Sequence, residues 1–183
     1  ESESRGLGDV YKRQLLILSC VTAWAADFDK GSAAYEAGDF ATALAEWKPL
    51  AEQGSALKFF GWYRHSDKVG VALAQNSLGI MYENGEGVIE DDKEAVKWYR
   101  LAAEQGIAEA QYKLALMYNG GKGVIKDDKK AFKWFRLAAE QGNTKAQSRV
   151  GFMYDSGLGV IEDNRKAVKW YRLAAEQGIA EAQ

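Results

Sequence analysis

The chain has very little cysteine, histidine or proline. Its 183 residues include one cysteine, Cys20, and one histidine, His65. These two side chains cannot supply the four ligands of a usual zinc site, and a single cysteine excludes a disulfide within the chain. The single proline fits long helical stretches, because proline breaks helix interiors. We therefore expect no metal site, and nothing in the sequence indicates a cofactor.

An excess of one charge is also missing. The 24 lysines and arginines nearly balance the 26 aspartates and glutamates, which gives a formal net charge of −2. Proteins that bind nucleic acid usually carry a strong basic excess, so we expect no nucleic-acid partner. Hydrophobic residues make up 47% of the chain, which is enough to bury a core and excludes a disordered tail.

The first 14 residues contain a segment that matches a translated laboratory sequence. Residues 9–14 read DVYKRQ, which is one translation of GATGTGTATAAGAGACAG, a string that looks like the transposase mosaic end used in preparing sequencing libraries. We interpret residues 1–14 as wholly or partly a non-native leader. The alternative is a native polar leader.

Residues 15–25 form a short apolar run, LLILSCVTAWA, that ends in the small-x-small pattern Ala23-Trp24-Ala25. Such a run before a small-x-small site is typical of a secretory signal peptide, here without its start. Two alternatives are a lipoprotein signal acylated at Cys20 and a buried first helix. The small-x-small site lies after Cys20 and favours the secretory reading. The run is too short to span a membrane, which takes ~20 apolar residues. We expect an exported mature chain, in a bacterial periplasm, with no membrane span.

A repeat of 36 residues dominates the rest of the chain. It is marked by tryptophan, glycine and methionine positions, which are Trp98/Trp134/Trp170, Gly106/Gly142/Gly178 and Met81/Met117/Met153. Three full units follow from it, residues 71–106, 107–142 and 143–178. Residues 179–183, IAEAQ, read as the start of a further, truncated unit.

Each unit predicts two helices. In the second unit the first helix is expected over about 108–118, with Ala110, Leu114, Met117 and Tyr118 on one apolar face. The glycines of G-x-G-V-x-x-D permit a sharp turn, and the aspartate is a natural N-cap for the second helix, about 128–141. This helix is expected to turn six apolar side chains inward, Ala131, Phe132, Trp134, Phe135, Ala138 and Ala139. We expect the repeated Trp and Tyr to be core, with Trp beside a small residue of the first helix, Gly79, Ala115 or Gly151. Stacked helix pairs form an all-α solenoid with a concave surface.

The units resemble the Sel-1-like repeat, a relative of the tetratricopeptide repeat. Its pattern stands here in residues 74–106, at Ala74, Leu78, Gly79, Met81, Tyr82, Gly85, Gly87, Val88, Asp91, Lys93, Ala95, Trp98, Tyr99, Ala102 and Gly106. The resemblance implies an α-solenoid that acts as an adaptor or scaffold in protein complexes and that is often exported in bacteria.

The segment before the repeats resembles a tetratricopeptide helix pair, residues 26–57, with Gly38-Asp39-Phe40 at its turn. Residues 58–70 break the period. They read as an insert or a degenerate repeat, because Trp62 and Gly70 fall in phase with Trp98 and Gly106. A remnant second helix, a specialised loop and an assembly fault all remain open.

Several motifs resemble catalytic or binding sites, and each has a simpler interpretation. His65-Ser66-Asp67 are adjacent, which is not the geometry of a triad. The Gly-x-Gly pairs follow helices rather than strands, so they are turn glycines and not phosphate cradles. The acidic clusters at 90–92 and 126–128 lack the spacing of a calcium loop and suit helix capping. The second helices carry a basic stripe that neighbouring acids balance, Lys97, Arg100, Lys133, Arg136, Lys169 and Arg172.

One set of positions on the first helices varies between units while the apolar frame does not. The set lies at i, i+4 and i+7 on one helical face. Its members are Asn76, Ile80 and Glu83, then Tyr112, Leu116 and Asn119, then Ser148, Phe152 and Asp155. Variation beside a fixed frame suits a binding groove, although an unconstrained surface shows it too. We expect Tyr112, Leu116 and Phe152 to be exposed anchors.

Three functions follow as hypotheses. The first is an exported scaffold that binds a protein or peptide in the concave groove. The second is an enzyme, because some exported members of the resembled family, rich in paired cysteines, have been proposed to bind or hydrolyse β-lactams. This chain lacks those cysteines and has no nucleophile beside a base, so we predict that it is not an enzyme. The third is a cell-wall-associated structural or regulatory protein.

Overall fold

The computed structural model describes residues 28–57 and 65–178. Every regular element among these residues is an α-helix. The chain divides into two compact units, residues 1–74 and 75–183, and the boundary falls inside a helix. The interpretations of residues 1–14 and 15–25, of Cys20 and of residues 179–183 lie outside the described residues.

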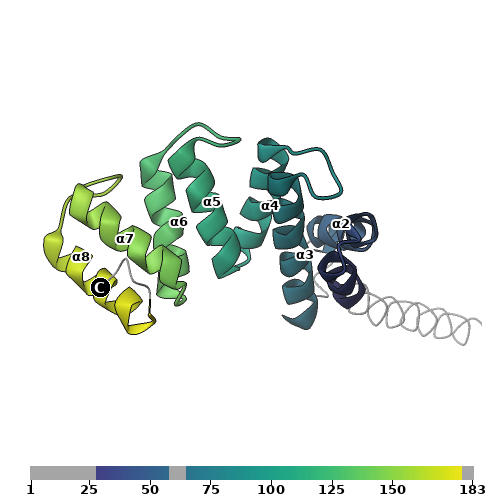
Figure 1. Ribbon diagram of the computed structural model, residues 1–183, viewed down its shortest axis with the longest axis horizontal. Coiled ribbons are helices and arrows are strands. Elements are labelled where there is room, and N and C mark those ends of the chain that lie inside the picture. Colours follow the sequence, from purple (N-terminus) through teal and green to yellow (C-terminus); the bar gives the residue numbers. More distant parts are fainter. Residues whose placement is uncertain (1–27, 58–64, 179–183) are drawn as a thin grey trace, which may run out of the picture. The chain divides into compact units, whose positions relative to one another are not determined.

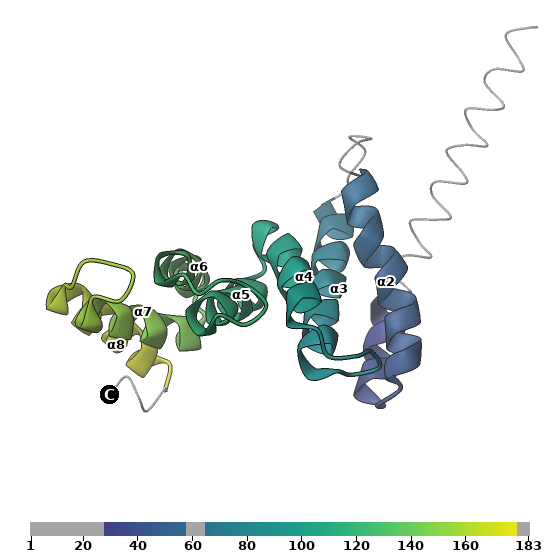
Figure 2. The ribbon, with the colours of Figure 1, turned by 90° about the horizontal axis from the view of Figure 1, so that it is seen from above.

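Residues 28–36 form the first described helix. The remaining helices are α2 (Phe40–Leu57), α3 (His65–Asn84), α4 (Asp92–Glu104), α5 (Ala108–Gly120), α6 (Asp128–Glu140), α7 (Thr144–Ser156) and α8 (Asn164–Glu176). In the second unit these helices pack in chain order, α4 on α5, α5 on α6, α6 on α7 and α7 on α8 (Figures 1 and 2). The predicted all-α solenoid of helix pairs is confirmed.

The first unit contains an antiparallel helix pair held by one tryptophan. Trp47 on α2 is 3% exposed, and its ring lies 6.0 Å from that of Phe28 and 5.6 Å from that of Tyr35. The chain turns at Gly38, whose φ is +78°. Asp39 then caps α2 by accepting a hydrogen bond from the Thr42 backbone nitrogen at 3.1 Å. A left-handed glycine followed by an N-cap is the usual way to join two short helices.

The irregular segment ahead of the repeats is partly helical. Residues 65–70 belong to α3, which runs without a break through Gly70 into the first repeat. This helix has 20 residues, whereas α5 and α7 have 13 each. The first repeat therefore begins with a longer helix than the two that follow. Residues 58–64 lie outside the described residues.

The repeats share one buried frame. Ala110, Leu114 and Met117 of α5 are at most 1% exposed, and Tyr118 is 8% exposed, as the apolar period predicts. On α6 the buried residues are Ala131, Phe135, Ala138 and Ala139. Equivalent positions on the neighbouring helices continue this frame, so that one apolar core runs through the stacked pairs.

The prediction that tryptophan fills the space beside the small residues is wrong. Trp98, Trp134 and Trp170 are half-buried. The ring against Gly79 is that of Tyr99, whose Cδ1 would lie 2.5 Å from a Cβ at position 79. Trp and Tyr are neighbours in the chain and lie about 100° apart around a helix. The tyrosine points at the first helix, and the tryptophan lies at the margin of the core.

The turns and caps follow the expected pattern. Gly121 and Gly123 have φ values of +70° and +64°, in the left-handed region that favours glycine. The Asp127 side chain accepts a hydrogen bond from the Lys130 backbone nitrogen at 2.9 Å. The Asp127 backbone nitrogen donates to the Tyr118 carbonyl oxygen at 2.9 Å, which closes the turn. The other two repeats have the same glycines and the same closure.

Candidate partner-binding surface

The nine predicted partner-binding residues all retain solvent-accessible area. Seven of them are half-buried: Asn76, Ile80, Glu83, Tyr112, Leu116, Asn119 and Ser148. Phe152 and Asp155 are exposed. We call the nine residues the variable stripe. It runs along α3, α5 and α7, the first helices of the three repeats.

In the first repeat the variable stripe is held by a charged network. The Tyr99 hydroxyl donates a hydrogen bond to Glu83 Oε2 at 2.6 Å. Lys113 Nζ of the next repeat lies 2.9 Å from the same oxygen. Glu83 therefore joins the two helices of its own repeat to the first helix of the next one. A partner that takes this carboxylate would compete with two existing contacts.

In the second repeat the variable stripe also has structural contacts. The Tyr112 ring lies 5.7 Å from the Phe135 ring. Asn119 Nδ2 donates to Asp128 Oδ1 at 3.1 Å, which ties α5 to the start of α6. The expectation that Tyr112 and Leu116 are exposed is wrong, because both pack against the core. Each belongs to a repeat that another described repeat follows.

The third repeat presents the most open part of the variable stripe. Phe152 is 47% exposed, and it is the one member of the three expected anchors that is exposed. Burial raises the pKa of the Tyr171 hydroxyl, and the Asp155 carboxylate raises it further. The Ser148 hydroxyl oxygen is buried without a hydrogen-bond partner among the described residues. An apolar ring, a carboxylate and an unused hydroxyl thus occur on one helix.

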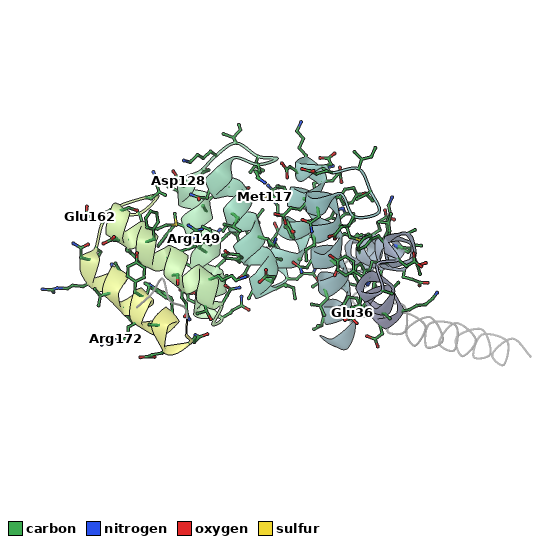
Figure 3. The ribbon with its side chains drawn as sticks, viewed as in Figure 1. Glu36, Met117, Asp128, Arg149, Glu162 and Arg172 are labelled. Carbon is green, nitrogen blue, oxygen red and sulfur yellow. The ribbon has the colours of Figure 1, made fainter. Side chains whose placement is uncertain are left out.

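The basic stripe lies on the solvent-facing side of the second helices. All six of its residues are exposed. Several contact neighbouring groups, as Lys97 does with Glu94 and Arg136 with Glu140. Arg100 donates to the Tyr118 hydroxyl oxygen at 2.9 Å. Figure 3 shows Arg172 on α8, extending away from the other helices. The stripe is a solvated face whose charges are partly matched within the chain.

The other motifs take the structural roles expected of them. The Gly-x-Gly pairs form turns, and Asp91, Asp127 and Asp163 cap helices. Among residues 28–57 and 65–178, no group of histidine, cysteine, aspartate and glutamate is arranged to hold a metal ion. The side chains of His65, Ser66 and Asp67 lie outside the described residues.

In the part of the chain that the structure describes, residues 28–57 and 65–178, none of the helices is both apolar enough and long enough to cross a bilayer.

Each repeat has a buried glutamine at the same position, and we call Gln75, Gln111 and Gln147 the glutamine ladder. Gln111 and Gln147 link neighbouring repeats, a role that is not evident from apolar periodicity. Gln75, Gln111 and Gln147 are at most 4% exposed. Gln111 Nε2 donates to the Ala103 carbonyl oxygen at 3.1 Å, across the boundary between two repeats. Its Oε1 accepts a hydrogen bond from Gln141 Nε2 at 2.7 Å. The recurrence of glutamine every 36 residues is the sequence signal that could have identified this ladder.

The comparison with family models decides the family. The model of the Sel1 repeat matches residues 72–107, 108–143 and 144–179, more than half of the chain. The chain belongs to the Sel1 repeat family. The three matches coincide with the helix pairs α3–α4, α5–α6 and α7–α8, and the resemblance seen in the sequence is confirmed. A search of curated proteins found no match.

Solved structures of Sel1 repeat proteins are similar to this one. One is c5321, a protective antigen of uropathogenic Escherichia coli strains with an SLR fold, at 36% identity and a TM-score of 0.76. That comparison covers 93% of this chain and 34% of the antigen. Another is a Sel1 repeat protein from Oxalobacter formigenes, at 37% identity and a TM-score of 0.67, covering 85% of this chain and 57% of that protein. This chain therefore spans about a third of the length of the E. coli antigen and somewhat over half of the length of the Oxalobacter formigenes protein.

A third similar structure is cysteine rich protein B of Helicobacter pylori. Its TM-score is 0.53 and its identity is 21%, over 64% of this chain and 90% of that protein. At this identity the likeness concerns the fold. Together these comparisons support a helical-repeat scaffold of the kind that generally mediates protein interactions.

Proposed function

We propose that this Sel1 repeat protein is an exported, non-catalytic scaffold that binds a protein or peptide along the variable stripe. One observation carries the proposal. The buried frame is nearly the same in all three repeats, whereas the accessible positions beside it change from repeat to repeat. A solenoid turns such positions into an extended concave surface, on which each repeat contributes a different contact.

The third repeat is proposed as the main anchor point. Phe152 is exposed, and aromatic side chains dominate the energetics of protein interfaces. The first two repeats contribute side chains that the protein already holds in place, such as Glu83 and Tyr112. Side chains fixed before binding lose little conformational entropy when a partner arrives. The partner class is a peptide or loop with an apolar residue for Phe152.

A displayed peptide library offered to the immobilised chain tests this proposal. The test variant is Phe152→Ser, and the matched control is Val168→Ser, which changes another exposed apolar residue of the same repeat on α8. We expect peptides that the parent and the control retain and that the Phe152 variant loses by roughly tenfold or more in affinity. Peptides that bind all three proteins equally would remove the variable stripe from consideration.

Export has a separate test. Residues 15–25 are proposed to direct secretion, with cleavage between Ala25 and Ala26. Residues 15–183 preceded by a start methionine and a short lysine-containing n-region should yield a periplasmic protein in a bacterial host, and its first residue should be Ala26. A product that stays uncleaved in the cytoplasm would argue against export without affecting the binding proposal. A membrane-bound product labelled by a lipid precursor would favour acylation of Cys20.

A further inference from the structure

Three isoleucines are almost fully exposed at equivalent places. Ile89, Ile125 and Ile161 are 90%, 91% and 88% exposed, far more than any other large hydrophobic residue of the described chain. Each follows a valine that is half-buried. The valine packs inward and the isoleucine points outward, so the fold itself does not use the isoleucine side chain. A feature repeated three times without a use inside the fold suggests a use outside it.

The three isoleucines stand on one continuous edge. We call residues 85–94, 121–130 and 157–166 the turn edge. Successive turns touch through backbone: a Cβ at Gly123 would lie 2.2 Å from the Asp92 carbonyl oxygen, and one at Gly159 would lie 2.2 Å from that of Asp128. Figure 1 shows the three turns along the same side of the repeats, and Figure 3 shows Asp128 and Glu162 there.

The turn edge is rigid. Each turn has two left-handed glycines, and a backbone hydrogen bond of 2.9 Å closes it, as from Asp91 to Tyr82 and from Asp163 to Tyr154. The aspartate that ends the turn caps the following helix. Rigid turns hold the isoleucines in place before any partner binds, which lowers the entropic cost of association.

Charge along the turn edge changes sign. The first turn has five carboxylates and one lysine, the second has four lysines and two aspartates, and the third has two of each sign. In the second turn, Lys130 and Lys126 pair with Asp127 and Asp128 at 3.1 and 3.7 Å. Lys122 and Lys129 make no ion pair with a described residue. The second turn therefore has an excess of basic residues beside its isoleucine, and the first turn has an excess of acidic ones.

We propose that the turn edge binds a second copy of this chain. In an isologous pair each surface meets itself about a two-fold axis. An axis between the first and second turns places the acidic turn of each copy against the basic turn of the other, twice. The same axis sets Ile89 against the partner's Ile125. A two-fold axis through the second turn would instead place the lysines of one copy against the same lysines of the other copy, which is unfavourable. The third turn, which has balanced charge, lies at the margin of the contact.

Charge exchange gives the sharpest test. One variant is Glu86→Lys with Glu90→Lys, and the other is Lys122→Glu with Lys126→Glu. Each change installs the residue that the neighbouring turn already has at the equivalent position, so the backbone tolerates it. At the exchanged positions, either variant alone sets like charges against each other across the two-fold axis, and we expect each to remain monomeric. Mixing the two variants restores opposite charges at those positions, and we expect a heterodimer.

Sedimentation of the full chain, over about 1 to 100 µM, measures the association. The parent should pass from monomer to dimer, with a weaker transition at high salt. Ile125→Ser should weaken the dimer by about tenfold or more, Ile161→Ser by much less, and Val168→Ser on α8 not at all. Circular dichroism checks that each variant stays helical.

Three outcomes would overturn the proposal. The parent could remain monomeric throughout, the mixed charge variants could fail to associate while the parent dimerises, or Ile125→Ser could leave the dimer intact. Vesicles of phosphatidylcholine with phosphatidylglycerol supply one more arm. Binding of the monomeric parent to vesicles, lost with Ile125→Ser, would show that lipid and not a second copy covers the isoleucines. None of these results depends on the variable stripe, so peptide binding by Phe152 is judged separately.

Discussion

The first and third repeats contain the same residues at key positions and bury them differently. Val96 on α4 is 4% exposed, whereas its equivalent on α8, Val168, is 56% exposed. Tyr99 is fully buried and Tyr171 is half-buried, although each lies against a glycine of its own repeat. The difference is the neighbour, because α5 packs on α4 and no described helix follows α8. A repeat thus supplies part of its own core and depends on the next repeat to cover the remainder.

The largest expected effect contrasts the two tyrosines. Tyr99→Ala removes a fully buried ring and its hydrogen bond to Glu83, and we expect a loss of about 3–5 kcal/mol in the free energy of unfolding. Tyr171→Ala removes a ring that is already half in water, so its effect should be less than half as large. Urea denaturation of both variants measures the contrast. Equal losses would mean that neighbouring repeats do not determine the burial energy.

A second contrast concerns contact between turns. Gly123→Ala places a Cβ against the Asp92 backbone and keeps a positive φ of +64°, so we expect a loss of about 2–4 kcal/mol. Gly142→Ala also has a positive φ, +89°, but its Cβ would meet nothing within 4 Å. That control should lose only about 1–2 kcal/mol. Equal denaturation midpoints for Gly123→Ala and Gly142→Ala would show that close contact between successive turns does not contribute to the loss.

A third contrast involves the glutamine ladder. Gln111→Leu leaves the Ala103 carbonyl oxygen and the Gln141 amide without their partners, which we expect to cost about 1–3 kcal/mol. Gln141→Leu removes the hydrogen bond to Gln111 Oε1 but leaves the one from Gln111 to the Ala103 carbonyl oxygen in place. That variant should lose less than about 1 kcal/mol. If Gln141→Leu lowers the free energy of unfolding more than Gln111→Leu does, the buried hydrogen bond to Ala103 is not the main stabilising contact of the glutamine ladder.

The smallest expected effect concerns the aspartate caps of the second and third repeats, and it should be the same in both. Hydrogen bonds from the Lys130 and Lys166 backbone nitrogens hold the pKa values of Asp127 and Asp163 below the usual carboxyl range. A lowered pKa in the folded state stabilises the fold above the ordinary carboxyl pKa, and this stabilisation is lost as pH falls through the lowered value.

Asp127→Asn and Asp163→Asn keep a cap of similar quality but remove the titration. Stability near neutral pH should stay almost unchanged, and the decline on acidification should become shallower by the same amount in each variant. Urea midpoints from about pH 2 to 7 follow this. A larger change at one cap than at the other would mean that capping, too, depends on the neighbouring repeat.

The 36-residue repeat made the helix pairs predictable from the sequence. Contacts between residues far apart in the chain were not predictable in the same way. The helix bounds of the second repeat, the turn glycines and the aspartate caps depend on a few adjacent residues. The bounds lie within two residues of those expected, and the glycines and caps are as expected. The choice between Trp98 and Tyr99 as the buried ring depends on about 100° of rotation around α4, which adjacent aromatic residues leave open. The continuous helix α3 was not predicted, because residues 58–70 break the 36-residue period and were interpreted as an insert or a degenerate repeat.

The variable stripe illustrates the same limit. Its helical face follows from spacing, but the burial of Tyr112 depends on Phe135, 23 positions further along the chain. Exposure of Phe152 depends equally on what lies beyond its own helix. The spacing of residues predicts the face of the helix on which a side chain lies, but it does not predict which other helix packs against that face.

The glutamine ladder also bears on how a gene for such a protein changes length. Gln111 meets the backbone of Ala103, and Gln147 meets that of Ala139, with the same two atoms in each case. A duplication of 36 codons would carry a complete donor and a complete acceptor with it. Recombination between copies of the repeat therefore adds or removes a whole module in frame, and the junction it creates is chemically identical to the one it replaces.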